Sequence, residues 1–332
     1  MSLKTKYLGL DLSNPLVASA SPLSAKLDNL RLLEDAGAAA IVLPSLFQEQ
    51  IEAEAQAIDD RQIYANSSPE ALTYFPSAAS GPYGVGPERY VDLVRRATEA
   101  LEIPVIASLN GSSLAGWVDY AGHLEKAGAA ALELNMYHVP TNLMETGQDI
   151  EARYLEIVDA VCATVNLPVS IKLTPFLSSV GNFATTLVTH GASGLVLFNR
   201  LLQPDIDVAH LSLTDVLELS QPAEIRLPLL WTAILAGRTP ASLATSTGVT
   251  TSADVVKCLL AGADVVMTTS ALLRHDISYM KTLVAGLKHW MDEREFASLC
   301  EMRGMLSWAR SADRSLYTRA NYLRILERYA DA

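Results

Sequence analysis

Four segments of the sequence share one pattern, in which a helix-like stretch reaches a Gly-Ala pair and then a short apolar run that ends in polar residues. The segments are EDAGAAAIVLPS, EKAGAAALELN, VTHGASGLVLFN and LLAGADVVMTTS, with their glycines at Gly37, Gly128, Gly191 and Gly262. A glycine just past a helix can adopt the left-handed conformation that ends it. An uninterrupted apolar run of about six residues is typical of a strand buried on both faces. The pattern therefore predicts helix-to-strand turns of a parallel sheet.

Four more stretches resemble these strands but lack the Gly-Ala turn: Leu16 to Ser21, Pro104 to Leu109, Pro168 to Leu173 and, more weakly, Ser242 to Thr247. They bring the number of predicted strands to eight, and a stretch able to form a helix separates each pair. Eight parallel strands in one chain of this length favour a closed (β/α)8 TIM barrel of the α/β class. A doubly wound open sheet is the alternative, although no glycine-rich dinucleotide turn follows the first strand.

Length and composition are consistent with one large domain. The chain has 332 residues, half of them apolar, which is enough to bury a single extensive core. We therefore predict one domain over 1–332, with inserted loops at the C-terminal face of the barrel strands. The longest insertion is expected at about 47–100 and a helical extension at about 277–332.

The charge and the cysteines exclude several classes of partner. A net charge of −12 repels phosphate, which disfavours nucleic acids and anionic membranes and leaves small molecules as the expected ligands. The three cysteines form neither a CxxC pair nor a metal-like cluster with histidine, so we expect no metal site. No apolar run approaches the roughly 20 residues that span a bilayer, and a cytoplasmic location is the resulting expectation.

Polar residues stand where the predicted strands end, which is where barrel proteins carry their chemistry. The set is rich in amides and hydroxyls and contains one lysine: Ser19, Ser21, Pro44, Ser45, Asn110, Asn135, Lys172, Asn199, Ser246 to Gly248, and Thr268 to Ser270. Amides offer paired donors and acceptors to the edge of a neutral heteroaromatic ring, whereas a metal needs His or carboxylate clusters. A ring-shaped organic ligand is therefore favoured.

Lys172 is the most informative residue of this set, because a cation at the end of an apolar strand is costly unless an anion or an electron-rich ligand meets it. It could form a Schiff base in a lyase, donate to a flavin ring, or simply reach solvent. In the last two strand-to-helix loops, Thr247, Thr269 and Ser270 could hold a phosphate, although such residues also serve as ordinary helix caps.

Read in order, these segments resemble a known family, the FMN-containing barrel enzymes around class 1 dihydroorotate dehydrogenase and the flavin domain of dihydropyrimidine dehydrogenase. The matching strings are NPLVASAS, PVIASLNGSS, ALELNMY, LPVSIKLTP, GLVLFN and STGVTTSADVVKCLLAGADVVMTTSAL. The strings LPSLFQEQI, LFNRLLQPDID and RANYLRIL are typical of its dihydroorotate dehydrogenase-like subgroup. The resemblance implies an FMN-dependent oxidoreductase acting on a CH–CH bond of dihydroorotate or a related dihydropyrimidine-like substrate. It also implies a separate electron acceptor and is consistent with a homodimer.

The resemblance also implies roles for particular residues. The expected FMN contacts are Ser19, Ala20, Ser21, Ser45, Asn135, Lys172, Asn199, Thr247, Gly248, Thr269 and Ser270. The expected substrate contacts are Asn135, Asn142, Asn199 and Arg200. Lys172 is also expected to act in catalysis, by stabilising negative charge on the reduced ring.

Two loops depart from the family pattern. Where the family has a catalytic cysteine, this chain reads NMYHVPTN, and His138 falls at that place. A neutral imidazole is a competent base, so we predict His138 as the catalytic base, with a turn-capping histidine as the alternative. The loop SAASGPYGVGPERY lacks the family's substrate asparagine. Arg200 or Arg89 could compensate by meeting an anion, or Arg200 could brace its loop through Asp205 or Asp207.

Two further readings stay open at this point. A non-catalytic FMN-binding homologue would keep Lys172 and the phosphate loops yet show no turnover, which fits the absent cysteine. A Schiff-base lyase would use Lys172 covalently and would need no flavin.

Overall fold

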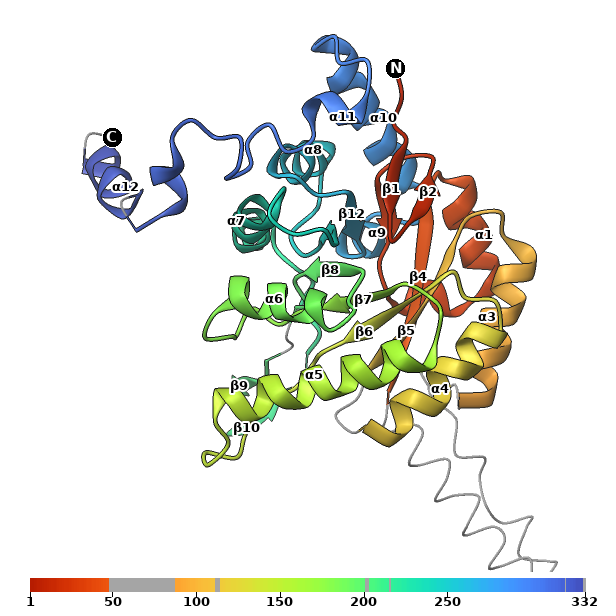
Figure 1. Cartoon of the computed structure of the whole chain (residues 1–332). Helices are drawn as coiled ribbons and strands as arrows, with labels where there is room; N and C mark the ends of the chain where they lie inside the picture. Colours follow the sequence, from red (N-terminus) through yellow and green to blue (C-terminus); the bar gives the residue numbers. More distant parts are fainter. Residues whose placement is uncertain (48–86, 111–113, 201–202, 215, 320, 331–332) are drawn as a thin grey trace, which may run out of the picture.

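Eight parallel strands close into a barrel with helices around it, as the computed structural model of the chain shows (Figure 1). The structure describes all residues except 48–86, 111–113, 201–202, 215, 320 and 331–332. The strand order around the barrel is β11-β12-β3-β4-β5-β6-β7-β8, and β8 pairs with β11 to close the ring. The predicted (β/α)8 barrel is confirmed, and the doubly wound alternative is excluded.

The barrel strands are short and buried, as the apolar runs predicted. They are β3 (Leu16–Ala18), β4 (Ala40–Phe47), β5 (Val105–Asn110), β6 (Ala131–Asn135), β7 (Val169–Lys172), β8 (Gly194–Leu197), β11 (Ser242–Thr245) and β12 (Val265–Thr268). All eight predicted strands are present, including the weaker candidate that became β11. In β4 the pairing with β5 shifts register between Val42 and Ser45, where Pro44 has no N–H to donate.

A helix follows every barrel strand, which is the alternation that a closed parallel barrel requires. These helices are α1 (Leu27–Asp35), α3 (Pro87–Ala100), α4 (Leu114–Lys126), α5 (Gly147–Thr164), α6 (Val180–Thr189), α7 (Arg226–Leu235), α8 (Ser252–Ala261) and α10 (Tyr279–Glu293). The short helix α9 (Ser270–Arg274) lies between β12 and α10, and the 3-10 turn η1 (Pro22–Ala25) precedes α1.

The four predicted glycine turns have the left-handed backbone that ends a helix. The φ angles are +95° at Gly37, +94° at Gly128, +104° at Gly191 and +120° at Gly262. At Gly262 a Cβ atom would also lie 2.3 Å from the Cβ of Ala236, so both backbone and space demand glycine there. The recurrent Gly-Ala pattern was therefore a correct signal of where strands begin.

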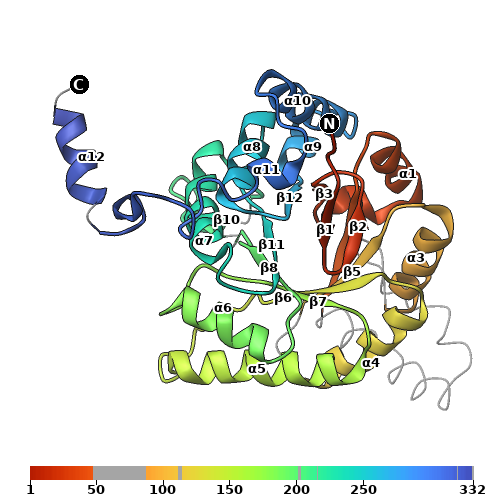
Figure 2. The same cartoon turned by 45° about the horizontal axis from the view of Figure 1, so that its top comes forward.

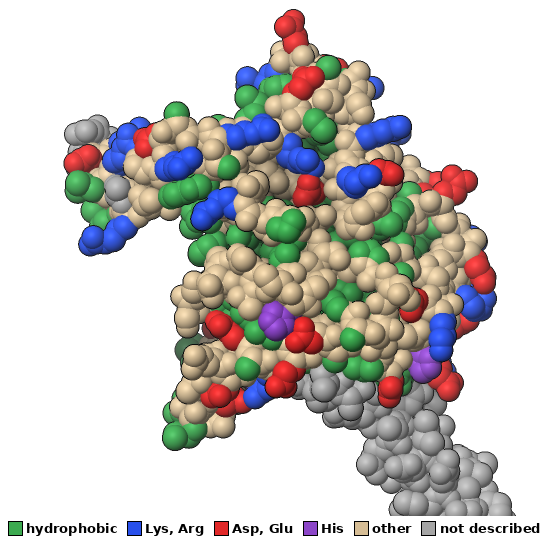
Figure 3. Space-filling view, in the orientation of Figure 1, with side chains coloured by type: hydrophobic (Ala, Val, Ile, Leu, Met, Phe, Trp, Pro, Cys, Tyr) green, Lys and Arg blue, Asp and Glu red, His purple; other side chains and the backbone are tan. Residues whose placement is uncertain are grey.

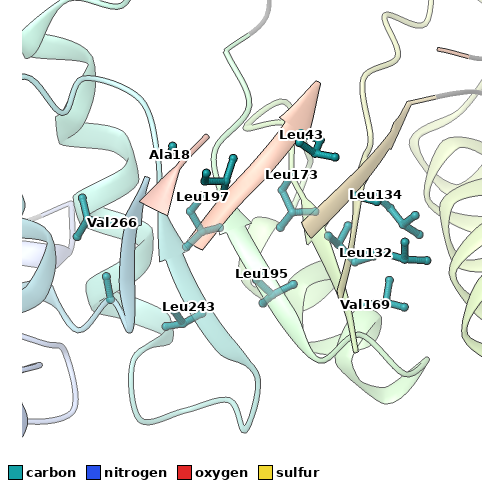
Figure 4. Close-up of a cluster of buried hydrophobic side chains, with 14 of the residues drawn as sticks. Ala18, Leu43, Leu132, Leu134, Val169, Leu173, Leu195, Leu197, Leu243 and Val266 are labelled. Atoms are coloured by element: carbon teal, nitrogen blue, oxygen red, sulfur yellow. The ribbon is translucent and has the colours of Figure 1, made fainter. Parts of the chain in front are cut away.

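Alternation along the strands separates two layers of the core. Leu132 and Leu134 of β6 belong to the layer between barrel and helices, together with Val169 of β7 (Figure 4). Ala131 belongs to the smaller cluster inside the barrel. Because successive side chains of a strand point to opposite faces, the residues two and four positions after Ala131 share its inward side. On β6, the part of the barrel interior near the C-terminal end of the strand is consequently polar, with Glu133 and Asn135.

An antiparallel hairpin that precedes the barrel was not predicted. Its strands are β1 (Thr5–Tyr7) and β2 (Leu10–Leu12), and their Tyr7, Leu8 and Leu12 side chains pack into the inner cluster. The Leu8 amide donates to Ser242 Oγ at 3.0 Å. The hairpin thus covers the N-terminal end of the barrel and leaves the opposite end for a ligand.

The connection from β8 to α7 carries a second hairpin, formed by β9 (Asp205–Asp207) and β10 (Ser212–Thr214), and then the 3-10 turn η3 (Pro222–Ile225). Figure 1 shows this hairpin and the β1–β2 hairpin at opposite ends of the barrel. The segment from β8 to α7 therefore belongs to the end at which the barrel strands terminate.

The predicted helical extension begins with α10 and continues through α11 (Leu299–Met302), η4 (Arg314–Tyr317) and α12 (Asn321–Ala330). In Figures 1 and 2, α12 lies apart from the barrel at the end of an extended segment. Of the predicted insertion at about 47–100, the first residue completes β4 and the last part forms α3, whereas 48–86 lie outside the described residues. Among the described helices, none is long and apolar enough to cross a membrane.

Candidate active site

A cleft of about 230 Å³ opens where the barrel strands end, and loops from five strands line it. Ten of the predicted site residues meet there: Ser19, Ala20, Ser21, Lys172, Asn199, Arg200, Thr247, Gly248, Thr269 and Ser270. They end or follow β3, β7, β8, β11 and β12, so residues as far apart in the sequence as Ser19 and Ser270 line the same cleft. We call this hollow the Lys172 cleft.

Lys172 is buried, and its partner is a carboxylate that the sequence analysis did not nominate. Its Nζ lies 3.5 Å from Glu133 Oε1 and 3.3 Å from Ser19 Oγ. Glu133 is completely buried, and its Oε2 has no hydrogen-bond partner among the described residues. The strand-end rule missed Glu133 because this residue lies two positions before the end of β6. Strand alternation was the usable signal, since Glu133 shares the inward face with Asn135.

The loops after β11 and β12 are joined by hydrogen bonds to the Ser220 hydroxyl. Ser270 Oγ lies 2.9 Å from Ser220 Oγ, and the Gly248 amide donates to Ser220 Oγ at 3.3 Å. The Thr269 hydroxyl donates to the Ser19 carbonyl at 3.0 Å, which ties the loop after β12 to the loop after β3. Ser220 was not predicted, because it comes from the long connection after β8 rather than from a strand end.

The loop after β11 has an unusual backbone at the cleft. Thr247 has a φ of +75° and Gly248 a φ of +76°, and a Cβ on Gly248 would lie 2.4 Å from the Ile225 nitrogen. A threonine in the left-handed region costs about 1–3 kcal/mol, and such strained positions cluster at ligand sites. The Thr247 hydroxyl donates to the Phe198 carbonyl at 3.1 Å, which helps to hold this turn.

Two asparagines form a pair beside the cleft. Asn199 Nδ2 donates to Asn135 Oδ1 at 2.8 Å, and Asn135 Nδ2 donates to Ser45 Oγ at 3.4 Å. Ser45 in turn lies 2.8 Å from Ser108 Oγ. Asn199 lines the Lys172 cleft, whereas Asn135 and Ser45 are not among its lining residues. The amide-rich end of the barrel is therefore a connected network rather than a set of separate ligand contacts.

The structure places His138 and Asn142 away from the Lys172 cleft. His138 lines a neighbouring cleft, where its Nε2 lies 4.0 Å from Glu145 Oε2. Asn142 is exposed, and its Oδ1 accepts from the Met144 amide at 3.1 Å. These two positions on the loop after β6 are therefore not among the residues that line the Lys172 cleft.

The predicted bracing partners of Arg200 were wrong. Its Nε donates to Glu224 Oε1 at 3.0 Å, and its guanidinium also bonds the Glu218 carbonyl. Asp207 is instead engaged by His210 at 2.6 Å. Arg89 is exposed in the first turn of α3 rather than in a loop. The prediction relied on acidic residues close to Arg200 in sequence, whereas its actual partner, Glu224, lies in η3.

Fold and site together define a (β/α)8-barrel protein with a cleft at the C-terminal ends of its strands, lined by a buried lysine and hydroxyl-rich loops. The family model described as "Dihydroorotate dehydrogenase" matches residues 84–291 of this chain. The chain belongs to the dihydroorotate dehydrogenase family.

Individual relatives agree with this assignment. A protein of Aeropyrum pernix named "Putative dihydroorotate dehydrogenase A (fumarate)" is 31% identical over 219 residues, 64% of this chain and 70% of the relative. The "Dihydroorotate dehydrogenase B (NAD(+)), catalytic subunit" of Pyrococcus furiosus is 26% identical over 311 residues, 92% of this chain and 99% of the relative. The protein of the same name from Thermoplasma acidophilum is 26% identical over 308 residues.

Proposed function

We propose that this chain is an FMN-dependent oxidoreductase that acts on a CH–CH bond of dihydroorotate or a related dihydropyrimidine-like ring. Family membership and the names of the relatives support the reaction class. The observation that carries the proposal is the Lys172 cleft, which is lined by a buried lysine and by hydroxyl-bearing loops.

The residues of the cleft fit FMN chemically. Thr247, Thr269 and Ser270 provide hydroxyls, and the glycine turn at Gly248 lets the backbone come close to a phosphate. Lys172 provides a positive charge for a ring that becomes negative on reduction. The side chains of Ser19 to Ser21 are small enough for a flat ring to lie against the loop after β3. Bound FMN would supply a two-electron acceptor for hydride.

The protein groups have distinct proposed roles. Glu133 and Ser19 hold the Lys172 ammonium at the inner end of the cleft. Asn199, oriented by Asn135, presents an amide edge to the substrate ring. His138 is the proposed base, since its Nε2 has no hydrogen-bond partner among the described residues and its loop begins directly after Asn135.

Glu133 weighs against the Schiff-base lyase. A Schiff-base lysine needs its Nζ free to attack a carbonyl carbon, whereas Lys172 Nζ already lies 3.5 Å from Glu133 Oε1 and 3.3 Å from Ser19 Oγ. The contact between Glu133 and Lys172 does not argue against a non-catalytic FMN-binding homologue. Turnover is what separates it from the proposed enzyme.

The test is the visible spectrum of the purified protein under anaerobic conditions, before and after dihydroorotate is added. We expect a flavin spectrum that bleaches with dihydroorotate or with a neutral dihydropyrimidine. A flavin spectrum that no such compound bleaches would favour the non-catalytic homologue. A protein that cannot be loaded with FMN at all would overturn the proposal.

A homodimer is part of the proposal. The apolar side chains of α12 are exposed, among them Leu323 (62%) and Ile325 (56%). Figure 3 shows hydrophobic and basic side chains together on this C-terminal arm. Such a face gains free energy when it is covered, and sedimentation equilibrium with and without residues 319–332 would show whether a second copy covers it.

A further inference from the structure

A second cleft lies at the mouth of the barrel, and the proposed reaction does not account for its shape. Its volume is about 340 Å³, in the range of small-molecule pockets. The loop after β6, the first turns of α5 and the loop after β7 form its walls, through residues that include His138, Glu145, Ile150, Tyr154, Phe176 and Gln203. We call it the Tyr154 cleft.

Two residues that line this cleft each have a buried polar atom without a hydrogen-bond partner among the described residues. These atoms are Tyr154 Oη and His138 Nε2. Tyr154 is 3% exposed, and its ring packs against Phe183 at 6.3 Å. Leaving a buried hydroxyl unpaired costs about 1–3 kcal/mol, so a group that supplies the missing partner would be stabilised there. Burial raises the pKa of Tyr154 to about 12, which keeps its hydroxyl a donor at neutral pH.

The rest of the lining defines what kind of molecule fits. Apolar side chains dominate, and Phe176 on the rim is 66% exposed, which is unusual for a phenylalanine. Glu145 is already paired with Arg153, whereas Glu151 leaves a negative charge in the cleft. That charge disfavours an anion. A simple ammonium ion offers only hydrogen-bond donors, so it cannot accept a hydrogen bond from the Tyr154 hydroxyl. A neutral ring with a carbonyl acceptor meets both demands.

A third hollow lies between the Tyr154 cleft and the Lys172 cleft and shares lining residues with each. This hollow, between the loops after β7 and β8, shares Phe176 and Gln203 with the Tyr154 cleft. The same hollow shares Asn199 and Thr247 with the Lys172 cleft. A molecule in the Tyr154 cleft therefore lies beside the proposed substrate position and not on a remote surface.

We propose that the Tyr154 cleft is a ligand site for a neutral, mostly apolar ring compound that carries an amide or carbonyl group. The Tyr154 hydroxyl donates to the carbonyl, and His138 Nε2 meets the adjoining polar atom of the ring. The site shares His138 with the proposed function, but its test needs neither FMN nor turnover, so the two proposals can fail separately.

The experiment uses 2-quinolone, a neutral bicyclic amide, as the probe, with binding to the full chain measured by isothermal titration calorimetry. Tyr154→Phe keeps the ring and its packing and removes only the unpaired hydroxyl. We expect this variant to bind 2-quinolone about tenfold more weakly, the loss of one hydrogen bond, and to be at least as stable as the wild type. Phe176→Ala, which removes an exposed wall, should also weaken binding.

Tyr7→Phe is the matched control, because Tyr7 Oη is likewise buried and has no hydrogen-bond partner in the described part of the chain, but lies at the closed end of the barrel. It should leave 2-quinolone binding unchanged. The proposal is overturned if wild type and Tyr154→Phe bind the probe equally, if the wild type does not bind it, or if benzylamine or benzoate binds more tightly than 2-quinolone. Thermal unfolding of each variant shows whether a loss of binding is a loss of folding.

Discussion

At the scale of single residues, the main finding is that the lysine of the candidate site has a buried counterion. Glu133 and Lys172 lie on neighbouring strands and meet inside the barrel, where water does not screen them. A buried carboxylate is tolerated when a cation and hydrogen bonds compensate it. One oxygen of Glu133 lacks a hydrogen-bond partner among the described residues. The fold therefore holds the two residues together although the hydrogen bonding of Glu133 is incomplete.

Replacing Lys172 with methionine should lower the reduction potential of bound FMN. The ammonium stabilises negative charge on the reduced ring, and a loss of about 1.4 kcal/mol corresponds to about 30 mV for a two-electron couple. Dye equilibration under anaerobic conditions measures the potential. The matched control is Lys257→Met on α8, a half-exposed lysine paired with Asp254, which should leave the potential unchanged. An unaltered potential in the Lys172 variant would remove its proposed role.

Replacing Glu133 with glutamine should destabilise the protein by about 3–5 kcal/mol, since it leaves a buried ammonium without its counterion. The double variant with Lys172→Met should recover part of this loss. Urea unfolding gives both values. Glu99→Gln breaks an exposed pair with Arg95 and should cost no more than about 1 kcal/mol. Equal losses of unfolding free energy in the Glu133 and Glu99 variants would show that the buried pair stabilises the protein no more than an exposed pair does.

At the scale of secondary structure elements, the helix-to-strand turns are the most reliably coded feature of the chain. Each of the four glycines has a positive φ that other residues adopt only with strain, and each is followed within a few residues by a barrel strand. The same local code does not reveal which loops meet. The bracing of Arg200 by Glu224, across a long connection, is an example.

Replacing Gly262 with alanine should destabilise the protein by about 2–4 kcal/mol, the sum of left-handed strain and overpacking against Ala236. Gly9→Ala separates the two causes. Gly9 has a φ of +78°, but a Cβ atom there would meet nothing within 4 Å, so only about 1–2 kcal/mol is expected. Thermal or urea unfolding of the two variants measures the difference. Similar losses would mean that the contact with Ala236 relaxes freely.

At the scale of the whole molecule, the barrel has one closed end and one open end. The β1–β2 hairpin packs into the inner core at the N-terminal end, while polar residues of the strands and loops face the other end. This polarity fixes where a ligand can enter. Because β12 pairs with β3, the loops that follow the first and the last barrel strand also meet, as Ser19 and Thr269 do.

Binding of FMN should stabilise the whole chain. A ligand that binds only the folded state adds about 2.7 kcal/mol at a free concentration of about 100 times its Kd, so the melting temperature should rise with FMN concentration. Riboflavin, which lacks the phosphate, should stabilise the protein less, because it cannot use the loops after β11 and β12. Differential scanning calorimetry of flavin-free protein measures both. Equal effects of the two compounds would contradict the proposed phosphate loops.

The amino-acid sequence was sufficient to predict the barrel, its eight strands, and most of the residues that line the Lys172 cleft. These features depend on local signals, namely apolar runs, glycine turns and the rule that barrel chemistry lies at strand ends. Only the tertiary structure decided that Glu133 faces Lys172, that Ser220 joins Gly248 and Ser270, and that His138 lines a cleft with Tyr154. Those contacts join segments distant in sequence, and their partners are set by how strands and loops come together in space rather than by any nearby residue pattern.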